Sequence, residues 1–206
     1  KGGKWMMEDG KTEAKDVKAR DIKGTEAAFK DGAKLPQLVV THKFKPQKWH
    51  DGAPVVKADW ELGYKVDCDR ESGNVSYFGC DRTAKYEVLD DNTIKVTYVP
   101  GYQPRTYYLF GNTPGRYPSH EVIKTAGPYA GKKLAEVAPK DFKTLPEIAE
   151  TPLGTGPYIL KERKKGTGMT LEANPNYVLG APKVKNIKVQ IFEGNPAGAV
   201  AALLSG

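Results

Sequence analysis

Hydrophobic and polar residues alternate along several short stretches of the chain, as they do in half-buried β-strands. The clearest case is a hairpin, in which Ala84–Leu89 and Thr93–Val99 flank an Asp90-Asp91-Asn92 turn. A second hairpin is expected around a turn of lysine and glycine residues. Altogether the alternation predicts strands at 38–44, 84–89, 93–99, 158–162, 169–173 and 184–192.

Helical spacing is clearest in Val55–Cys68, where apolar residues recur at mostly helical intervals. Two acids, Asp59 and Glu61, stand near its start, where they favour the helix dipole. An alanine-rich stretch at 197–204 predicts a second helix. The mixture of strands, hairpins and helices indicates an α/β (mixed α+β) fold.

Three further helical segments are expected from weaker patterns. Residues 12–30 predict a surface helix with Thr12 as its N-cap, although apolar positions in it are sparse. A short helix is expected after Pro118, and one or two helical turns within 134–148, where two prolines break them.

The composition is that of a globular chain with many turns. The 206 residues are 39% hydrophobic and 28% charged, with 22 glycines and 15 prolines. That length suits one large domain or two small ones. The sequence contains no apolar run long enough to span a membrane and no secretory signal, and both of its ends look cut from a longer protein.

The formal net charge is +7, from 32 basic and 25 acidic residues. Such an excess can attract nucleic acid or anionic lipid. The lysines, however, are spread along the chain with acids between them, as on a solvated surface. A basic nucleic-acid-binding module is kept as the alternative function, because Tyr102–Tyr108 combines basic and aromatic residues.

Catalytic constellations are not evident, and we expect no enzyme, no cofactor and no metal. The three histidines, His42, His50 and His120, do not have the spacing of metal ligands. The sequence also lacks the G-x-S-x-G motif that would supply a nucleophilic serine for a histidine base. Gly154–Pro157 departs from the phosphate-loop pattern, and its proline removes an N–H. A hydrolase is the less favoured alternative.

Cys68 and Cys80 are the only cysteines. A bridge between them would stabilise the fold by about 3 kcal/mol in the chain-entropy model, and it would persist only in an oxidising compartment. Two separate buried thiols fit the residues equally well.

Three segments together resemble the family 5 extracellular solute-binding proteins, the dipeptide- and oligopeptide-binding components of ABC importers. They are Lys45–Val55 with its Trp-His-Asp-Gly-Ala-Pro turn, Gly154–Leu160 with its Gly-Thr-Gly-Pro-Tyr strand entry, and Glu172–Tyr177 with its Asn-Pro-Asn-Tyr run. The closing Ala199–Gly206 also fits. Their order and spacing across 38–206 make the resemblance specific.

Two departures from the family pattern are visible. Val56 stands where the family has a helix-opening Thr, so the usual N-cap hydroxyl is missing. The sequence also stops at Gly206, where the family continues into a second lobe.

The resemblance implies a type II periplasmic-binding-protein-like lobe, with a mixed sheet, hairpins and flanking helices. Residues 1–206 would form the first lobe of a two-lobed protein, and 37–118 could form a subdomain within it. The protein would be periplasmic or held at the cell surface by a lipid anchor. It would close over a peptide or related solute and deliver it to the importer's permease subunits. The implied secretion favours a Cys68–Cys80 disulfide.

Candidate ligand contacts are Tyr102, Tyr107 and Tyr108, with the backbone near Thr155 and Gly156. For any one of the tyrosines, packing in the core of the lobe with the hydroxyl at its rim is the favoured interpretation. Other motif residues are expected to be structural: Trp49, Asp51, Gly52, Pro157, Asn174, Pro175 and Tyr177. The ligand could be a dipeptide, a longer peptide, a sugar oligomer or a metal chelate.

Overall fold

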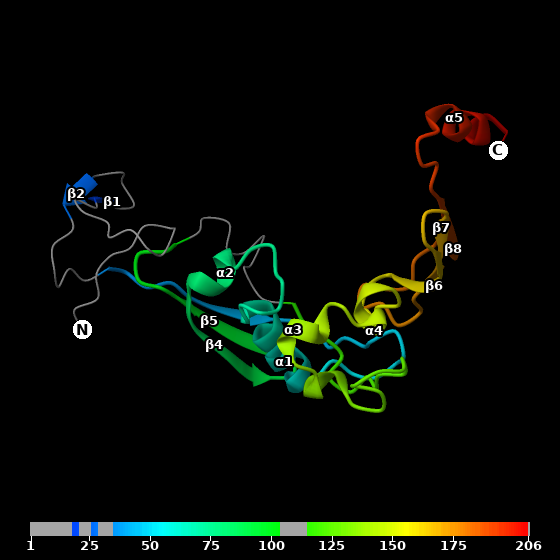
Figure 1. The fold of residues 1–206 in the computed structure, drawn as a ribbon. Coiled ribbons are helices and arrows are strands. Elements are labelled where there is room, and N and C mark those ends of the chain that lie inside the picture. Colours follow the sequence, from blue (N-terminus) through cyan, green and yellow to red (C-terminus); the bar gives the residue numbers. More distant parts are fainter. Residues whose placement is uncertain (1–17, 21–25, 29–34, 104–114, 206) are drawn as a thin grey trace.

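The structure, a computed structural model, describes residues 18–20, 26–28, 35–103 and 115–205 (Figure 1). A central sheet has three antiparallel strands in the order β3-β5-β4, namely β3 (Val39–Lys43), β5 (Thr93–Tyr98) and β4 (Thr83–Asp90). Strands β4 and β5 form the predicted hairpin, and β3 pairs with the other edge of β5. Every second residue of β5 is buried, as the alternation predicts.

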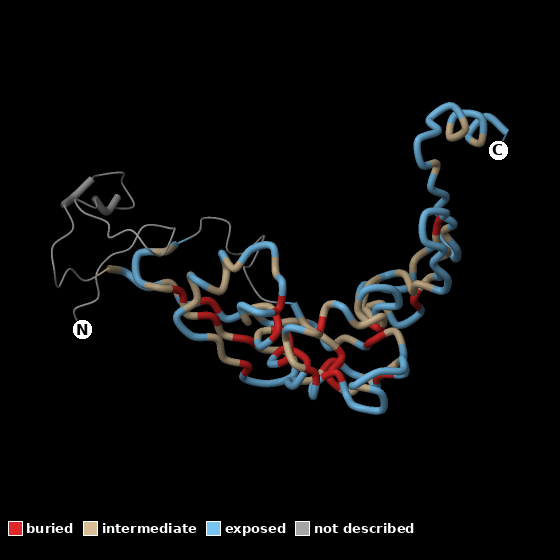
Figure 2. Tube along the Cα trace, viewed as in Figure 1, coloured by how far each residue is buried: buried red, intermediate tan, exposed pale blue. Residues whose placement is uncertain are grey.

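The helix α1 (Lys57–Cys68) separates two hydrophobic clusters, which are marked by the buried segments in Figure 2. Trp60 packs toward the sheet, in a cluster with Trp49, Val55, Val88 and Ile94. Leu62 and Val66 pack instead with residues from the second half of the chain, namely Ile123, Leu134, Val137 and Phe142. The core that α1 organises therefore runs past residue 118, and the subdomain at 37–118 stays a prediction.

Short helices cover the central sheet and α1. They are α2 (Phe78–Asp81), the 3-10 turn η1 (Leu134–Glu136), α3 (Pro139–Phe142) and α4 (Pro146–Ala149). The expectation that two prolines break this region is confirmed, because Pro139 and Pro146 each begin a new short helix after the previous one has ended. The region holds three such elements rather than one or two.

Two other helix predictions fail. No helix follows Pro118, because Ser119 and His120 form a turn and Val122 then pairs with Lys133 in a β-bridge. Within 12–30, the described residues form an antiparallel pair, β1 (Lys18–Arg20) with β2 (Glu26–Ala28). The sequence there has few apolar positions and a glycine at 24, which disfavours a helix interior.

The central sheet, α1 and the short helices form what we call the central body. A second sheet, which we call the outer sheet, projects from it (Figure 1). It has the antiparallel order β6-β7-β8, with β6 (Tyr158–Lys164), β7 (Gly168–Ala173) and β8 (Asn186–Gln190), and α5 (Pro196–Ser205) follows it. These strands and this helix match the sequence predictions. The helix-and-sheet class is confirmed, but every strand pair in the described residues is antiparallel, so they form no mixed sheet.

Asp59 joins the start of α1 to two other parts of the chain. Its side chain is fully buried. Oδ2 accepts hydrogen bonds from Trp49 Nε1 (2.8 Å) and from the backbone N of Val56 (2.9 Å). Oδ1 accepts two from Ser119, one from its backbone N (2.8 Å) and one from its hydroxyl (2.7 Å). The carboxylate thus makes one half of a capping box, in which the side chain at N3 accepts from the N–H of the N-cap residue, while the half that needs an N-cap hydroxyl is missing at Val56.

We expect Asp59→Asn to lower the free energy of unfolding by about 3 kcal/mol. The amide nitrogen cannot accept the two bonds at Oδ2 and faces two donors instead. Urea denaturation measures the loss. Glu61→Gln, an exposed change on the same helix, should cost less than about 0.5 kcal/mol. Equal midpoints for the two variants would contradict this role of Asp59.

Cys68, at the end of α1, forms a disulfide with Cys80 in α2. Reducing it should lower the free energy of unfolding by about 3 kcal/mol, because the unfolded chain gains freedom. Urea denaturation with and without reductant measures this difference. Two titratable thiols in the unreduced, denatured protein would show that the bridge is absent.

Candidate functional site

The chain passes from the central body to the outer sheet through residues 151–157, which we call the crossover. This segment contains the Gly-Thr-Gly-Pro motif and two of the predicted ligand contacts, Thr155 and Gly156. It packs against the turn that carries the Trp-His-Asp-Gly-Ala-Pro motif. The structure therefore brings two of the three family-like motifs together.

The turn is shaped by its own polar groups. Asp51 Oδ1 accepts a hydrogen bond from the backbone N of Ala53 (3.0 Å), and Gly52 adopts a positive φ of 89°. The backbone N of Trp49 donates to the carbonyl of Ala53 (2.8 Å). Asp51 also pairs with His120 at 2.8 Å. These contacts fix the direction in which His50 leaves the turn.

His50 and Asn174 hold the crossover by its carbonyl groups. The backbone N of His50 donates to Gly154 O (2.9 Å), and its Nε2 lies 3.2 Å from Gly156 O. A carbonyl only accepts, so Nε2 carries the proton in this contact. From the outer sheet, Asn174 Nδ2 donates to Gly156 O (2.8 Å) and its backbone N to Pro157 O (2.8 Å). All three family-like motifs thus contribute to the crossover, the third through Asn174.

Tyr102 lies elsewhere. Its half-buried ring packs edge-on against Tyr98 (5.6 Å between centroids) and Phe78 (6.1 Å), and the Arg82 guanidinium lies 5.5 Å from its centre. These contacts fit the alternative in which the tyrosine packs the lobe. Tyr107 and Tyr108 lie outside the described residues.

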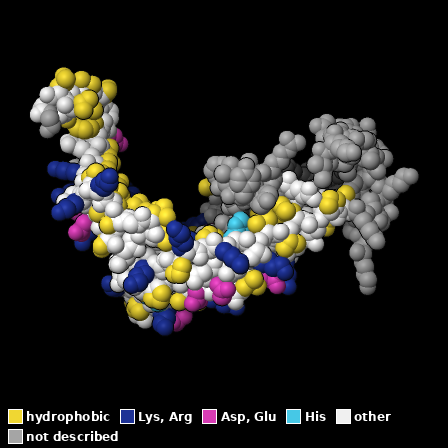
Figure 3. Space-filling view, turned by 180° about the vertical axis from the view of Figure 1, so that it is seen from behind, with side chains coloured by type: hydrophobic (Ala, Val, Ile, Leu, Met, Phe, Trp, Pro, Cys, Tyr) yellow, Lys and Arg dark blue, Asp and Glu magenta, His cyan; other side chains and the backbone are white. Residues whose placement is uncertain are grey.

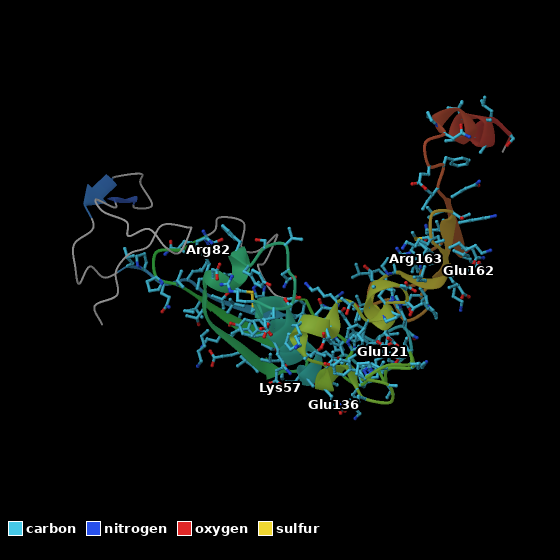
Figure 4. All side chains as sticks on the ribbon, viewed as in Figure 1. Lys57, Arg82, Glu121, Glu136, Glu162 and Arg163 are labelled. Carbon is cyan, nitrogen blue, oxygen red and sulfur yellow. A yellow bond between two sulfur atoms is a disulfide. The ribbon has the colours of Figure 1, made fainter. Side chains whose placement is uncertain are left out.

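The predicted ligand contacts do not form one cluster. Arg82, beside Tyr102, lies far from Glu162 and Arg163 on β6, the strand that the crossover enters (Figure 4). Sequence reasoning also missed Arg116, whose Nη2 donates to Thr155 Oγ1 at 2.7 Å. The only sequence signal for it was its place between the aromatic segment and Pro118.

Glu121 and Glu147 form a second polar cluster near the turn. Glu147 Oε1 accepts three hydrogen bonds, two from Thr125 and one from the backbone N of Lys124, while the Oε2 atoms of both glutamates are buried without a partner among the described residues. Burial, and after it the neighbouring charge of Glu147, raises the pKa of Glu121 to about 6.

The described residues contain no group of three or more His, Cys, Asp or Glu that could hold a metal ion. Among the helices of this part of the chain, none is long and apolar enough to cross a bilayer.

The motifs that meet at the crossover are those by which the sequence resembles a class of periplasmic-type binding proteins, and the comparisons with known proteins agree with that class. Residues 36–206 match the family model described as "Bacterial extracellular solute-binding proteins, family 5 Middle". The chain belongs to this family, and the resemblance found in the sequence is confirmed. The nucleic-acid and hydrolase alternatives gain no support.

Individual relatives agree with this assignment. The oligopeptide-binding protein OppA of Lactococcus lactis subsp. lactis is 29% identical over 170 residues, which cover 77% of this chain and 27% of OppA. A Brucella ovis protein of the ABC transporter peptide-binding kind is 27% identical over 170 residues, covering 82% of this chain and 29% of its own. The chain thus spans less than a third of these curated relatives.

Solved structures show the same fold. The oligopeptide-binding protein AppA of Bacillus subtilis, in complex with a nonapeptide, superposes with a TM-score of 0.65 at 21% identity, covering 92% of this chain and 36% of AppA. NikZ of Campylobacter jejuni, in complex with Ni(L-His), gives a TM-score of 0.61 at 19% identity over 93% of this chain and 36% of NikZ.

Glu121 should make folding stability depend on pH. Its pKa, about 6 in the folded protein, exceeds the ordinary value of 4.5, so the folded state binds more protons than the unfolded state between these values. This contribution is fully present below about pH 4.5 and is lost as the pH rises through 6. Glu147 and Asp51 raise this pKa, while His120 and Lys124 oppose them.

Glu121→Gln replaces the carboxyl group with an amide, which is uncharged at every pH. Relative to the unsubstituted protein, we expect the variant to gain about 1 kcal/mol of stability between pH 4.5 and 6.5, a value reduced for screening by water. Urea denaturation at several pH values measures this gain, with the exposed Glu150→Gln as control. A constant difference across this range would contradict the raised pKa.

Proposed function

We propose that this chain is part of the extracytoplasmic solute-binding component of an ABC importer. It would capture a peptide or related small solute in a cleft between two lobes and deliver it to the membrane permease, without catalysing a reaction. Membership of the solute-binding family over residues 36–206 carries this proposal. The printed names of the relatives, which are peptide-binding proteins, support peptide as the first ligand class to test.

We further propose that residues 1–206 belong to the first lobe and that a second lobe completes the cleft. The outer sheet supports this, because its rows alternate between two chemically different faces. Leu160, Leu171 and Ile187 stand opposite one another in one row. The row next to it is polar on two of its three strands, with Glu172 opposite Asn186. A face of the first kind is normally covered by another layer.

Helix α5 is equally uncovered. Leu203 and Leu204 are each 82% exposed and Val200 is 56% exposed, and Figure 3 shows hydrophobic side chains gathered on this helix. Contiguous apolar surface of this kind normally lies in an interface. We propose that the rest of the longer protein covers it.

Thr155 and Gly156 are the proposed ligand contacts that the structure describes in most detail. The Thr155 hydroxyl and the Gly156 carbonyl are already bonded within the protein. For the backbone N–H groups of these two residues, the described part of the chain offers no acceptor. Such donors suit the carbonyl oxygens of an extended peptide, which is held mainly by main-chain hydrogen bonds. Tyr102, Tyr107 and Tyr108 stay secondary candidates.

The family's extracellular description supports a periplasmic or cell-surface location. Attachment by a lipid anchor and docking to permease subunits are parts of the same proposal.

The full-length protein should gain thermal stability when its peptide binds, by RT ln(1 + [L]/Kd), and should release that peptide unchanged. Mass spectrometry of the solute that co-purifies identifies the ligand, and calorimetry then measures its affinity. Residues 1–206 alone, with half of the cleft, should bind it at least 100-fold more weakly. Turnover of the ligand, equally tight binding by residues 1–206, or salt-sensitive binding of an oligonucleotide in its place would contradict the proposal.

A further inference from the structure

Arg116 links three segments that are distant in sequence. Its Nη2 donates to Gln47 Oε1 (2.5 Å), at the start of the motif-bearing turn, and to Thr155 Oγ1 (2.7 Å) in the crossover. Its guanidinium carbon lies 4.8 Å from the ring centre of Trp60 on α1. The side chain therefore touches the turn, the crossover and the helix between the two hydrophobic clusters.

The electrostatic setting favours a fixed guanidinium at this point. Arg116 is half-buried, and the charge of the buried Asp59 attracts it. A desolvated cation that donates to two neutral acceptors and stacks on an indole is held in one geometry. A lysine could not reproduce the stacking, because its ammonium lacks the planar guanidinium face that lies against the Trp60 indole.

Besides Arg116, His50 holds the crossover to the central body through the carbonyls of Gly154 and Gly156. Those contacts fix backbone atoms of the crossover. Arg116 adds a bond to a side chain on the residue between them, Thr155. Leu153 also packs against the Trp49 cluster, and the backbone N of Thr151 donates to Pro146 O (3.0 Å). Together they leave the crossover little freedom to rotate, so the direction in which β6 departs is set.

We propose that Arg116 is a positioning residue, which fixes the crossover against the turn and thereby sets the orientation of the outer sheet relative to the central body. Its effect on solute affinity rests on the proposed function, in which the N–H groups of Thr155 and Gly156 face the ligand. Its effect on the crossover itself does not.

The contact between the turn and the crossover, which we call the joint, can be followed through the backbone N–H of His50. This N–H lies in the turn and donates to the carbonyl of Gly154 in the crossover. Hydrogen exchange at single amides of the full-length protein measures its protection. Arg116→Ala and Thr155→Val should each raise its exchange rate about tenfold or more, and the double variant should add little, since both remove the same bond.

The backbone N–H of Phe44, which donates to Asn92 O within the central sheet, should exchange at an unchanged rate in every variant. Arg70→Ala is the matched control. Arg70 also pairs with a side chain, Asp81, and stacks on a ring, Tyr77, but it lies outside the joint. In this variant His50 should keep its protection.

Calorimetry on the same variants of the full-length protein measures the effect on solute affinity. The affinity for the co-purified solute should fall about tenfold in Arg116→Ala and Thr155→Val, and stay unchanged in Arg70→Ala. An unchanged exchange rate at His50 in Arg116→Ala and Thr155→Val would overturn the positioning role, whatever the solute affinity. Raised exchange at His50 in a protein that binds no solute would support the positioning role and refute the proposed function instead.

Discussion

The buried carboxylate of Asp59 is the interaction on which the rest of the structure depends. Its four hydrogen-bond partners are all donors, and they come from the motif-bearing turn, the start of α1 and the segment at Ser119. A charge so placed costs several kcal/mol of lost hydration, and it is tolerated only where donors replace the water. The carboxylate therefore requires three distant segments to meet at one point, which a purely apolar contact would not specify.

The same point governs the joint between the two sheets. Because Asp59 fixes Trp49, the next residue along the turn, His50, is directed at the crossover. Because Asp59 also fixes Ser119, the chain just before it brings Arg116 over Trp60 and against Thr155. The two side chains that hold the crossover are thus neighbours in sequence of residues that Asp59 binds. Orientation of the outer sheet is a consequence of packing in the central body.

How far the sequence could predict this structure depends on the range of the interactions. The hairpin of β4 and β5 was predictable, since alternation and the Asp-Asp-Asn turn are local signals. The bonds from Ser119 to Asp59 were not, because they join residues 60 positions apart. The breaks at Pro139 and Pro146 were predictable, because a proline cannot continue the preceding helix and can open the next one. The family motifs identified the crossover, but nothing in the sequence showed that Tyr102 packs beside α2, away from it.

The contacts of the crossover also bear on what kind of recognition it can support. The Gly156 carbonyl is taken by Asn174 and His50, and the Thr155 hydroxyl by Arg116. What this segment could still offer a solute is therefore backbone N–H donors, held in place by side chains that bond to its other polar groups. Donors of this kind bind carbonyl oxygens, which every peptide has, and do not discriminate between side chains. If the proposed function holds, selection among peptides has to come from residues other than these two, and the crossover contributes affinity that is common to all of them.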